Sequence, residues 1–295
     1  MVAGPKTSPS LPGLLDLVES SPIASIKGTV SSVLALINDP AASPNDLKKI
    51  IEVDPPLVAK ILRVANSSLY ASSRTISDLD QALIWIGFDA LKEIVLTQKM
   101  SELYGGVGKQ VCSYSRSRLW RHSLAVALLA KAIYRREFGE KGNNAYAAGL
   151  MHDIGVIVED QLLHHSFLDL VSQTEERRLP LTDAELDAFG YDHGLVGMGL
   201  AERWNFPAEL REGIGFHHNP EAADPAHRDF VKTIFIADYL MFEQGYGYVD
   251  MPLADKEVVC QYARDLGLQC FALQAILAVA REEIAKIEAK GILVG

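Results

Sequence analysis

Cysteine is scarce in this chain of 295 residues. Its three cysteines, Cys112, Cys260 and Cys270, are widely spaced and form no CxxC pair. This spacing excludes a disulfide framework and a zinc site built from thiolates. We therefore expect the protein to work in a reducing, cytoplasmic compartment.

Long hydrophobic runs are also lacking, and no stretch approaches the roughly 20 apolar residues that a membrane-spanning helix needs. The first residues, MVAGPKTSPSLPG, have neither the charged start nor the apolar centre of a secretory signal. We interpret residues 1–14 as a flexible lead-in and expect no association with a membrane.

Basic residues are outnumbered, since 28 Lys and Arg face 38 Asp and Glu, which gives a net charge of −10. This balance argues against a general nucleic-acid surface, although it does not exclude a local basic pocket. Apolar residues make up 48% of the chain, which is enough for a large core in one domain or two closely packed ones.

Strand patterns are few, whereas helical patterns follow one another closely. In the first half, Ser43 precedes Pro44, and Asp54 precedes Pro55. Each pair is typical of a helix start, with a capping residue followed by proline in the first turn. Short helices at close intervals predict an orthogonal helical bundle over residues 15–104.

A glycine-rich segment, YGGVGKQVCSYS, marks the boundary after this bundle. No strand precedes it and no G-K-[ST] follows, so it does not match a phosphate-binding loop. The longer helical patterns beyond it predict a helical core over residues 113–245 and a helical extension over residues 246–295. We expect the last helix to pack through its apolar first half and to end in a charged, solvated tail. The fold class is therefore all-α.

Five of the eight histidines and two aspartates form an ordered set in the second half. The set comprises His122, His152, Asp153, His193, His217, His218 and Asp238. We interpret the other three histidines, His164, His165 and His227, as surface or helix-end residues.

Each member of the set, taken alone, has an ordinary structural explanation. A single buried histidine such as His122 is more often hydrogen-bonded in a core than bound to a metal. Asp192, before His193, reads as a helix cap. Asp238 is harder to explain, because a carboxylate within the apolar run IFIADYL costs several kcal/mol unless it is paired or binds a cation.

Taken together, the seven residues predict one buried metal centre. Imidazole and carboxylate ligands suit first-row divalent metals. Asp153 can use both carboxylate oxygens and so bridge two ions. Two ions about 3.5–4 Å apart can hold a phosphate and activate a water molecule.

The order H…HD…H…HH…D resembles the HD superfamily of metal-dependent phosphohydrolases. In the first half, DPPLVAKILRVANSSLY followed by ISDLDQALIWIGFDALKEIVL resembles the HDOD domain, a bacterial signalling relative of HD domains. The resemblance covers residues 15–245 and implies an N-terminal helical bundle packed on an HD-like helical core. It also implies a regulatory role and favours two ions of iron or manganese, with nickel or zinc as alternatives.

The superfamily pattern divides the seven residues into two sets that share Asp153. One ion would be held by His122, His152, Asp153 and Asp238. The second ion would be held by Asp153, His193, His217 and His218.

The chain departs from the related HD-GYP phosphodiesterases, which cleave cyclic dinucleotides. Their HDxGK motif has a lysine where this chain has Val156 in HDIGV, and their HHExxDGxGYP segment is replaced by HHNPEAADPAH. The glutamate that helps some of them to hold a third ion would fall near Arg118. These differences argue against hydrolysis of cyclic di-GMP.

Three functional hypotheses follow. The first is a signalling module that binds metal and acts on a separate protein partner, with Leu69, Tyr70 and Trp85 as candidates for the core first and for a contact surface second. The second is a phosphohydrolase acting on a nucleotide or another phosphate ester. In that case Arg118, Arg121 and Lys232 could neutralise phosphate. We favour the alternative that these three are ordinary solvated residues. The third is a helical scaffold with a vestigial site.

Overall fold

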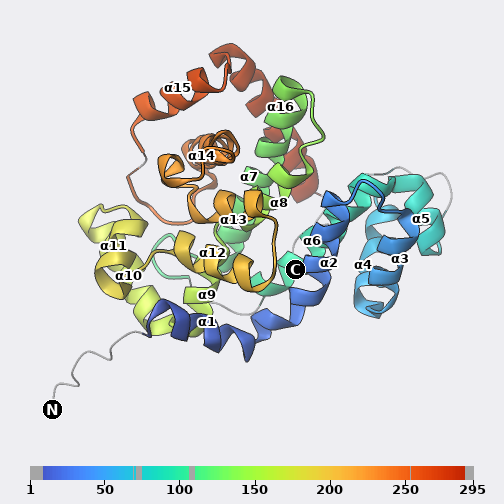
Figure 1. Cartoon of the computed structure of the whole chain (residues 1–295), viewed down its shortest axis with the longest axis horizontal. Helices are drawn as coiled ribbons and strands as arrows, with labels where there is room; N and C mark the ends of the chain where they lie inside the picture. The colour runs from blue at the N-terminus through green and yellow to red at the C-terminus, as the bar shows by residue number, and fades with distance from the viewer. Residues whose placement is uncertain (1–8, 69, 71–74, 106–109, 253, 290–295) are drawn as a thin grey trace.

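The computed structural model describes residues 9–68, 70, 75–105, 110–252 and 254–289 (Figure 1). Within these ranges the regular secondary structure is helical, apart from one isolated antiparallel bridge between Val111 and Tyr114. The prediction of an all-α fold is therefore confirmed. Leu69, most of the predicted lead-in and part of the glycine-rich boundary lie outside the described residues.

The N-terminal half forms short helices, of which α2 to α6 lie together at the right of the view while α1 lies below α9 (Ile154–Leu162), as Figure 1 shows. They are α1 (Leu11–Glu19), η1 (Pro22–Ile26), α2 (Lys27–Asn38), α3 (Pro44–Glu52), α4 (Pro55–Ala65), α5 (Leu79–Ile86), α6 (Phe88–Ser101) and η2 (Glu102–Tyr104).

The predicted helix starts of this half are confirmed. Ser43 and Asp54 are the N-cap residues of α3 and α4, and proline follows each. The Asp54 carboxylate accepts a hydrogen bond from the Leu57 amide at 3.0 Å, which satisfies an amide that the helix itself leaves unpaired. The first helix, α1, begins at Leu11, inside the predicted lead-in, because Ser10 caps it and Leu14 is buried.

On the bundle surface, Trp85 is 46% exposed and donates from Nε1 to the Tyr70 carbonyl at 3.0 Å. The neighbouring Ile84 is 85% exposed. Trp85 therefore belongs to the surface rather than to the core.

The second half contains the longer helices of the core. They are α7 (Arg116–Ile133), η3 (Tyr134–Phe138), α8 (Asn143–Met151), α9 (Ile154–Leu162), α10 (His164–Arg177), α11 (Leu181–Phe189), α12 (His193–Arg203), α13 (Ala208–Gly215), η4 (Pro220–Ala222), α14 (Arg228–Met241) and η5 (Phe242–Tyr246).

Helix α7 is the centre of this core and is buried on most of its faces. It packs against α8, α14 and α16. Small residues let α7 and α8 approach closely, since a β-carbon at Gly149 would lie 2.7 Å from the Ala127 Cα. This close approach brings the middle of α7 beside the end of α8, where the first predicted metal ligands lie.

The N-terminal bundle packs on the core through α1 and α6. Helix α1 contacts α9 and α12, and α6 contacts α8. The Thr97 and Tyr146 hydroxyls are hydrogen-bonded at 2.6 Å across the α6–α8 contact. Lys131 of α7 forms an ion pair with Glu93 of α6 at 2.5 Å.

Two further helices, α15 (Lys256–Asp265) and α16 (Cys270–Ala289), cover the far side of α7 and α14 (Figure 1). The prediction of a solvated tail for α16 was wrong in part. Ile284 and Ile287 are buried, and Glu288 pairs with Arg121 of α7. Ile284 and Ile287 lie between the charged residues at helical spacing and continue the packed apolar face of the helix.

Among the described residues, no single helix combines the length and the apolar composition needed to cross a membrane. Two pairs of consecutive helices meet both criteria only when the two helices of a pair are counted together, and each pair is bent where its helices meet. They are α1 with Pro22–Asn38 and α15 with α16.

Candidate metal centre

The seven predicted ligands come from five segments of the chain and converge at one place in the core. His122 lies within α7, and His152 and Asp153 form the junction of α8 and α9. His193 opens α12, where Asp192 caps the helix as predicted. The remaining members follow α13 or lie within α14, and they are His217, His218 and Asp238.

The first group surrounds the Oδ2 atom of Asp153. The Nε2 atom of His152 lies 3.0 Å from this oxygen, and Nε2 of His122 lies 3.5 Å from it. Oδ1 of Asp238 lies 3.0 Å from Nε2 of His122. This arrangement gives Asp238 the partner that its own helix lacks.

The second group surrounds the other oxygen of the same carboxylate. The Oδ1 atom of Asp153 lies 3.3 Å from Nε2 of His193 and 3.6 Å from Nε2 of His217. Nε2 of His218 lies 3.0 Å from Nε2 of His193. The two oxygens of Asp153 therefore face two different groups of imidazoles. The ligand atoms of His122, His152 and Asp153 lie within 4.8 Å of one another, and so do those of Asp153, His193, His217 and His218.

Two of these histidines are oriented by a hydrogen bond from their other ring nitrogen to a backbone carbonyl. Nδ1 of His152 lies 2.8 Å from the Gly149 carbonyl, and Nδ1 of His217 lies 2.7 Å from the Ile214 carbonyl. Because a carbonyl only accepts, each Nδ1 donates its hydrogen and leaves the Nε2 lone pair directed at the centre. Histidines that bind metals in proteins are held in this way.

The polar atoms of the centre fit a cation. Buried Oδ1 of Asp153 and Nε2 of His217 have no hydrogen-bond partner, although such buried atoms are normally paired. Nε2 of His122 and Nε2 of His152 lie 3.2 Å apart, as expected for lone pairs directed at a shared positive ion. The donor set of imidazole and carboxylate suits first-row divalent metals.

The electrostatics of the centre follow from this convergence. Burial alone would raise the pKa of Asp153, but His152, His193 and His217 hold the pKa of this carboxyl well below its usual range. Burial would lower the pKa of His193, yet the Glu185 and Asp153 carboxylates raise it well above the usual histidine value. Asp153 is therefore ionised and available as a ligand.

Gly155, in the HDIG segment, sets the distance between α9 and α12. A β-carbon at this position would lie 1.9 Å from the His193 carbonyl oxygen. We expect Gly155→Ala to lower the free energy of unfolding by at least about 1–3 kcal/mol, because α12 and His193 must move away. Chemical denaturation measures the change.

Gly28→Ala in α2 is the matched control, since a β-carbon there has open space. We expect this variant to gain about 0.5–1 kcal/mol from helix propensity. Equal unfolding free energies for the two variants would contradict the packing role of Gly155.

Glu185 of α11 is a buried residue of the site that the sequence interpretation missed. Its Oε2 accepts hydrogen bonds from the His193 amide at 2.9 Å and from His193 Nδ1 at 2.7 Å. Burial and the neighbouring Glu185 carboxylate raise the pKa of Glu159 well above its usual value. The only local signal was a carboxylate one turn after Leu181, on the buried face of α11.

We expect Glu185→Gln to weaken metal binding by about 10–100-fold, the usual cost of losing a partner that orients a ligand histidine. The neutral amide no longer stabilises the orientation of His193 through charge. Competition with a chelator of known affinity measures the change. Glu176→Gln on α10, where the side chain is exposed, is the control. Unchanged affinity in Glu185→Gln would refute the orienting role.

Tyr248 was also missed, because it lies beyond the last predicted helix of the core. Its ring centroid lies 5.3 Å from that of His122. Burial and the nearby Asp153 carboxylate raise the pKa of the Tyr248 hydroxyl well above its usual value. Tyr248 therefore closes one side of the centre with a neutral hydroxyl group.

The three basic residues considered for phosphate binding are engaged elsewhere. Arg118 donates to the carbonyls of Ser113 at 2.5 Å and Gly247 at 2.7 Å. Arg121 pairs with Glu288, and Lys232 pairs with Asp265 at 2.6 Å. The interpretation of all three as ordinary solvated residues was wrong for Lys232, which is buried.

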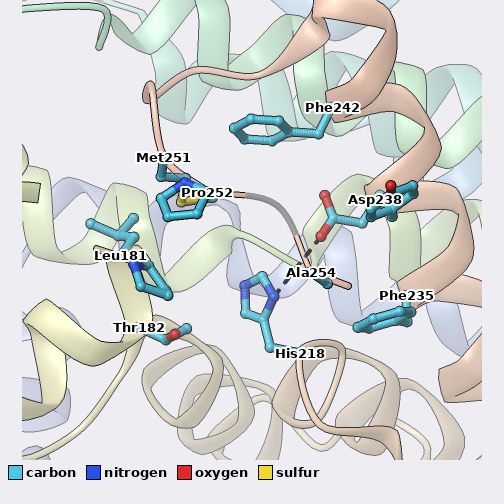
Figure 2. Close-up of a pocket in the computed structure, with 11 residues that line it drawn as sticks. Leu181, Thr182, His218, Phe235, Asp238, Phe242, Met251, Pro252 and Ala254 are labelled. Atoms are coloured by element: carbon cyan, nitrogen blue, oxygen red, sulfur yellow. Dashed lines mark ion pairs between the residues drawn. The ribbon is translucent and has the colours of Figure 1, made fainter. Parts of the chain in front are cut away.

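The centre adjoins a cavity at His218 and Asp238. His122, His152, Asp153, His193 and His217 are buried. By contrast, His218 and Asp238 line a cavity of about 200 Å³, and Figure 2 shows the two side chains pointing toward one another there.

Of the histidines outside the centre, His165 is exposed, His227 is the N-cap residue of α14, and His164 pairs with Asp160.

Comparison with known proteins places these observations in a family. The model of the HDOD domain matches residues 23–220. An uncharacterised protein of Treponema pallidum is 23% identical over 206 residues, which are 68% of this chain and 39% of that protein. The chain therefore spans well under half the length of this curated relative.

Solved structures share the fold. An HDOD domain protein of unknown function from Geobacter sulfurreducens is 28% identical, with a TM-score of 0.72, over 97% of this chain and 93% of its own. A proposed signal transduction protein of Marinobacter aquaeolei is 23% identical, with a TM-score of 0.74, over 91% of this chain and 59% of its own. A proposed phosphohydrolase of Shewanella amazonensis is 20% identical, with a TM-score of 0.70, over 97% of both chains.

Proposed function

The chain belongs to the HDOD family, and we propose that it is a bacterial signalling protein whose helical core binds two divalent metal ions. The observation that carries the proposal is the position of Asp153, whose two oxygens face separate groups of histidines. One ion would be held by His122, His152, Asp153 and Asp238. The other would be held by Asp153, His193, His217 and His218.

Iron or manganese is the favoured metal, with nickel or zinc as alternatives, because imidazole and carboxylate ligands accept all four. When bound, the ions would supply Lewis-acid polarisation of a ligand oxygen and would lower the pKa of water. The chain's own contribution is a rigid ligand set, because His152, His193 and His217 each have a fixed hydrogen-bond acceptor at Nδ1.

A regulatory role is favoured because the chain has ligands for metal but few groups to handle a phosphorylated substrate. Val156, at the place of the lysine in HDxGK, is fully buried in α9. Arg118, Arg121 and Lys232 contact other protein groups. A metal-dependent change in the packing of α7, α9, α12 and α14 would then be transmitted to a separate protein partner.

The second candidate is a metal-dependent phosphohydrolase that acts on a phosphate ester. It is favoured by the cavity that reaches the centre at His218 and Asp238. In this reading Asp153 would bridge the ions and would also orient the attacking water by accepting a hydrogen bond from it. The Tyr248 hydroxyl, which is neutral at physiological pH, can donate a hydrogen bond at the same place.

Metal analysis of the full chain tests the proposal. We expect close to two equivalents of iron or manganese after anaerobic reconstitution, measured by plasma mass spectrometry. Less than one equivalent per chain would refute the metal centre. On the fully metallated protein, turnover of phosphomonoesters that disappears in Asp153→Ala would favour the phosphohydrolase, and the absence of turnover would favour the signalling role.

A further inference from the structure

The cavity beside the metal centre has an unusual lining for a phosphate-handling site. Its walls come from the start of α11, from α14 and from the segment after η5, and Figure 2 shows them surrounding Asp238 and His218. The described residues of these walls are mainly apolar or aromatic. They include Leu181, Phe235, Phe242, Met251, Pro252 and Ala254.

Cationic side chains are absent from the described lining. Thr182 and Tyr239 are its polar members apart from the two candidate ligands. Exposed carboxylates adjoin the walls in the chain, at Asp183, Asp250 and Asp255. Lys256 follows them, but it lines a different cavity, between α14, α15 and α16. Apart from a bound metal, the local charge therefore opposes a ligand with several negative charges.

The size of the cavity sets a second limit. Its volume is about 200 Å³. Pockets that enclose drug-sized molecules span about 300–1,000 Å³. A single ring with a small head group is therefore a better match than a nucleotide.

The wall after η5 is held in place by specific contacts. Arg118 donates to the Gly247 carbonyl at 2.7 Å, and Glu175 accepts from the Asp250 amide at 3.2 Å. The Phe242 ring lies against Gly247, where a β-carbon would approach its Cζ atom to 2.8 Å. The apolar wall is therefore formed before a ligand arrives, which lowers the entropic cost of binding.

We propose that this cavity binds a compact ligand with one oxyanion head and an apolar, ring-sized body, and that it discriminates against nucleotides and polyphosphates. The inference rests on the proposed metal centre, which would attract the head group. Because the Asp238 carboxylate faces the cavity, the head group is repelled in the metal-free protein and binding depends on metal. The body is held by Phe242, Met251 and Leu181.

Isothermal titration calorimetry of the manganese-reconstituted full chain tests the proposed ligand class. The affinities of phenylphosphonate, methylphosphonate, inorganic phosphate and ADP are compared. Phenylphosphonate and methylphosphonate share the head group, so their difference reports the ring alone. Burying a ring of this size predicts at least about tenfold tighter binding of phenylphosphonate. We expect ADP to bind more weakly than phenylphosphonate.

Two substitutions of alanine by tryptophan locate the binding site. Ala254 is an exposed residue of the cavity, so Ala254→Trp fills the cavity without disturbing the core. We expect this variant to lose the tenfold preference for phenylphosphonate and to keep its metal. Ala41→Trp, at an exposed position in the turn between α2 and α3, is the control and should keep both.

The outcomes separate the two proposals. A fully metallated protein that binds methylphosphonate, phosphate or ADP as tightly as phenylphosphonate would overturn the ligand class alone. A metallated protein that binds no phosphonate, or an Ala254→Trp variant that keeps the preference, would also overturn it. A protein that retains no metal would overturn the metal centre and the ligand class together.

Discussion

Replacing Asp153 with asparagine is expected to remove both metal ions while leaving the helical fold intact. The neutral amide offers one oxygen where the carboxylate presents Oδ2 to His152 and Oδ1 to His193. Both groups of ligands therefore lose their shared anion. We expect a loss of affinity beyond the roughly 10–100-fold that removal of an outer partner costs. Metal content by plasma mass spectrometry, with circular dichroism for the fold, measures it.

Asp229→Asn is the matched control for this experiment. Asp229 lies on α14, as Asp238 does, but its side chain is exposed. The control should retain the metal content of the unmodified protein. Two retained equivalents in Asp153→Asn would show that this carboxylate does not bridge the ions.

Replacing Asp160 with asparagine is expected to cause a large loss of stability. Asp160 is buried in α9 and accepts hydrogen bonds from Arg116 at 2.5 Å and from the Tyr114 hydroxyl at 2.8 Å. His164 lies 2.7 Å from its other oxygen. Breaking a buried ion pair costs about 3–5 kcal/mol, and we expect the lower end because Arg116 keeps some solvent contact.

The effect of this substitution should depend on pH in a defined direction. Burial would raise the pKa of Asp160, but the hydrogen bonds from Arg116, Tyr114 and His164 lower it below the usual value. A carboxyl whose pKa is lower in the folded state stabilises the protein above its unfolded pKa of about 3.9. This stabilisation is lost as the pH falls through the lower folded pKa.

Urea denaturation between pH 7 and pH 3 measures this dependence. The difference between the unmodified protein and Asp160→Asn should be full at pH 7 and should shrink below about pH 4. Asp169→Asn on α10, where the side chain is exposed, is the control and should change little at any pH. A difference that stays constant down to pH 3 would contradict a role for the charge of Asp160.

The packing of the second half of α16 was not predicted from its hydrophobic pattern. Its second half carries enough charge to suggest a solvated tail, yet Ile284 and Ile287 pack toward α7. The charged residues occupy the solvent side of the same turns. Only the position of a neighbouring helix decides whether two isoleucines in such a segment are buried.

The seven ligand-type residues were predicted from the sequence because their residue types and order are distinctive. Glu185 and Tyr248 were missed, because one glutamate and one tyrosine carry no comparable local signal. Their roles arise from contacts with His193 and His122, which lie on other elements. The engagement of Arg118 with Gly247 likewise joins residues far apart in the chain.

The sequence by itself determined that the protein is all-α, where α3 and α4 begin and which residues could serve as metal ligands. These features depend on helical spacing and on local residue chemistry, both of which can be read along the chain. Only the tertiary structure decided that the two oxygens of Asp153 face different groups of histidines and that an apolar cavity opens at His218 and Asp238. These features depend on close contacts between helices, such as the contact of Gly155 with His193, which a one-dimensional pattern does not specify.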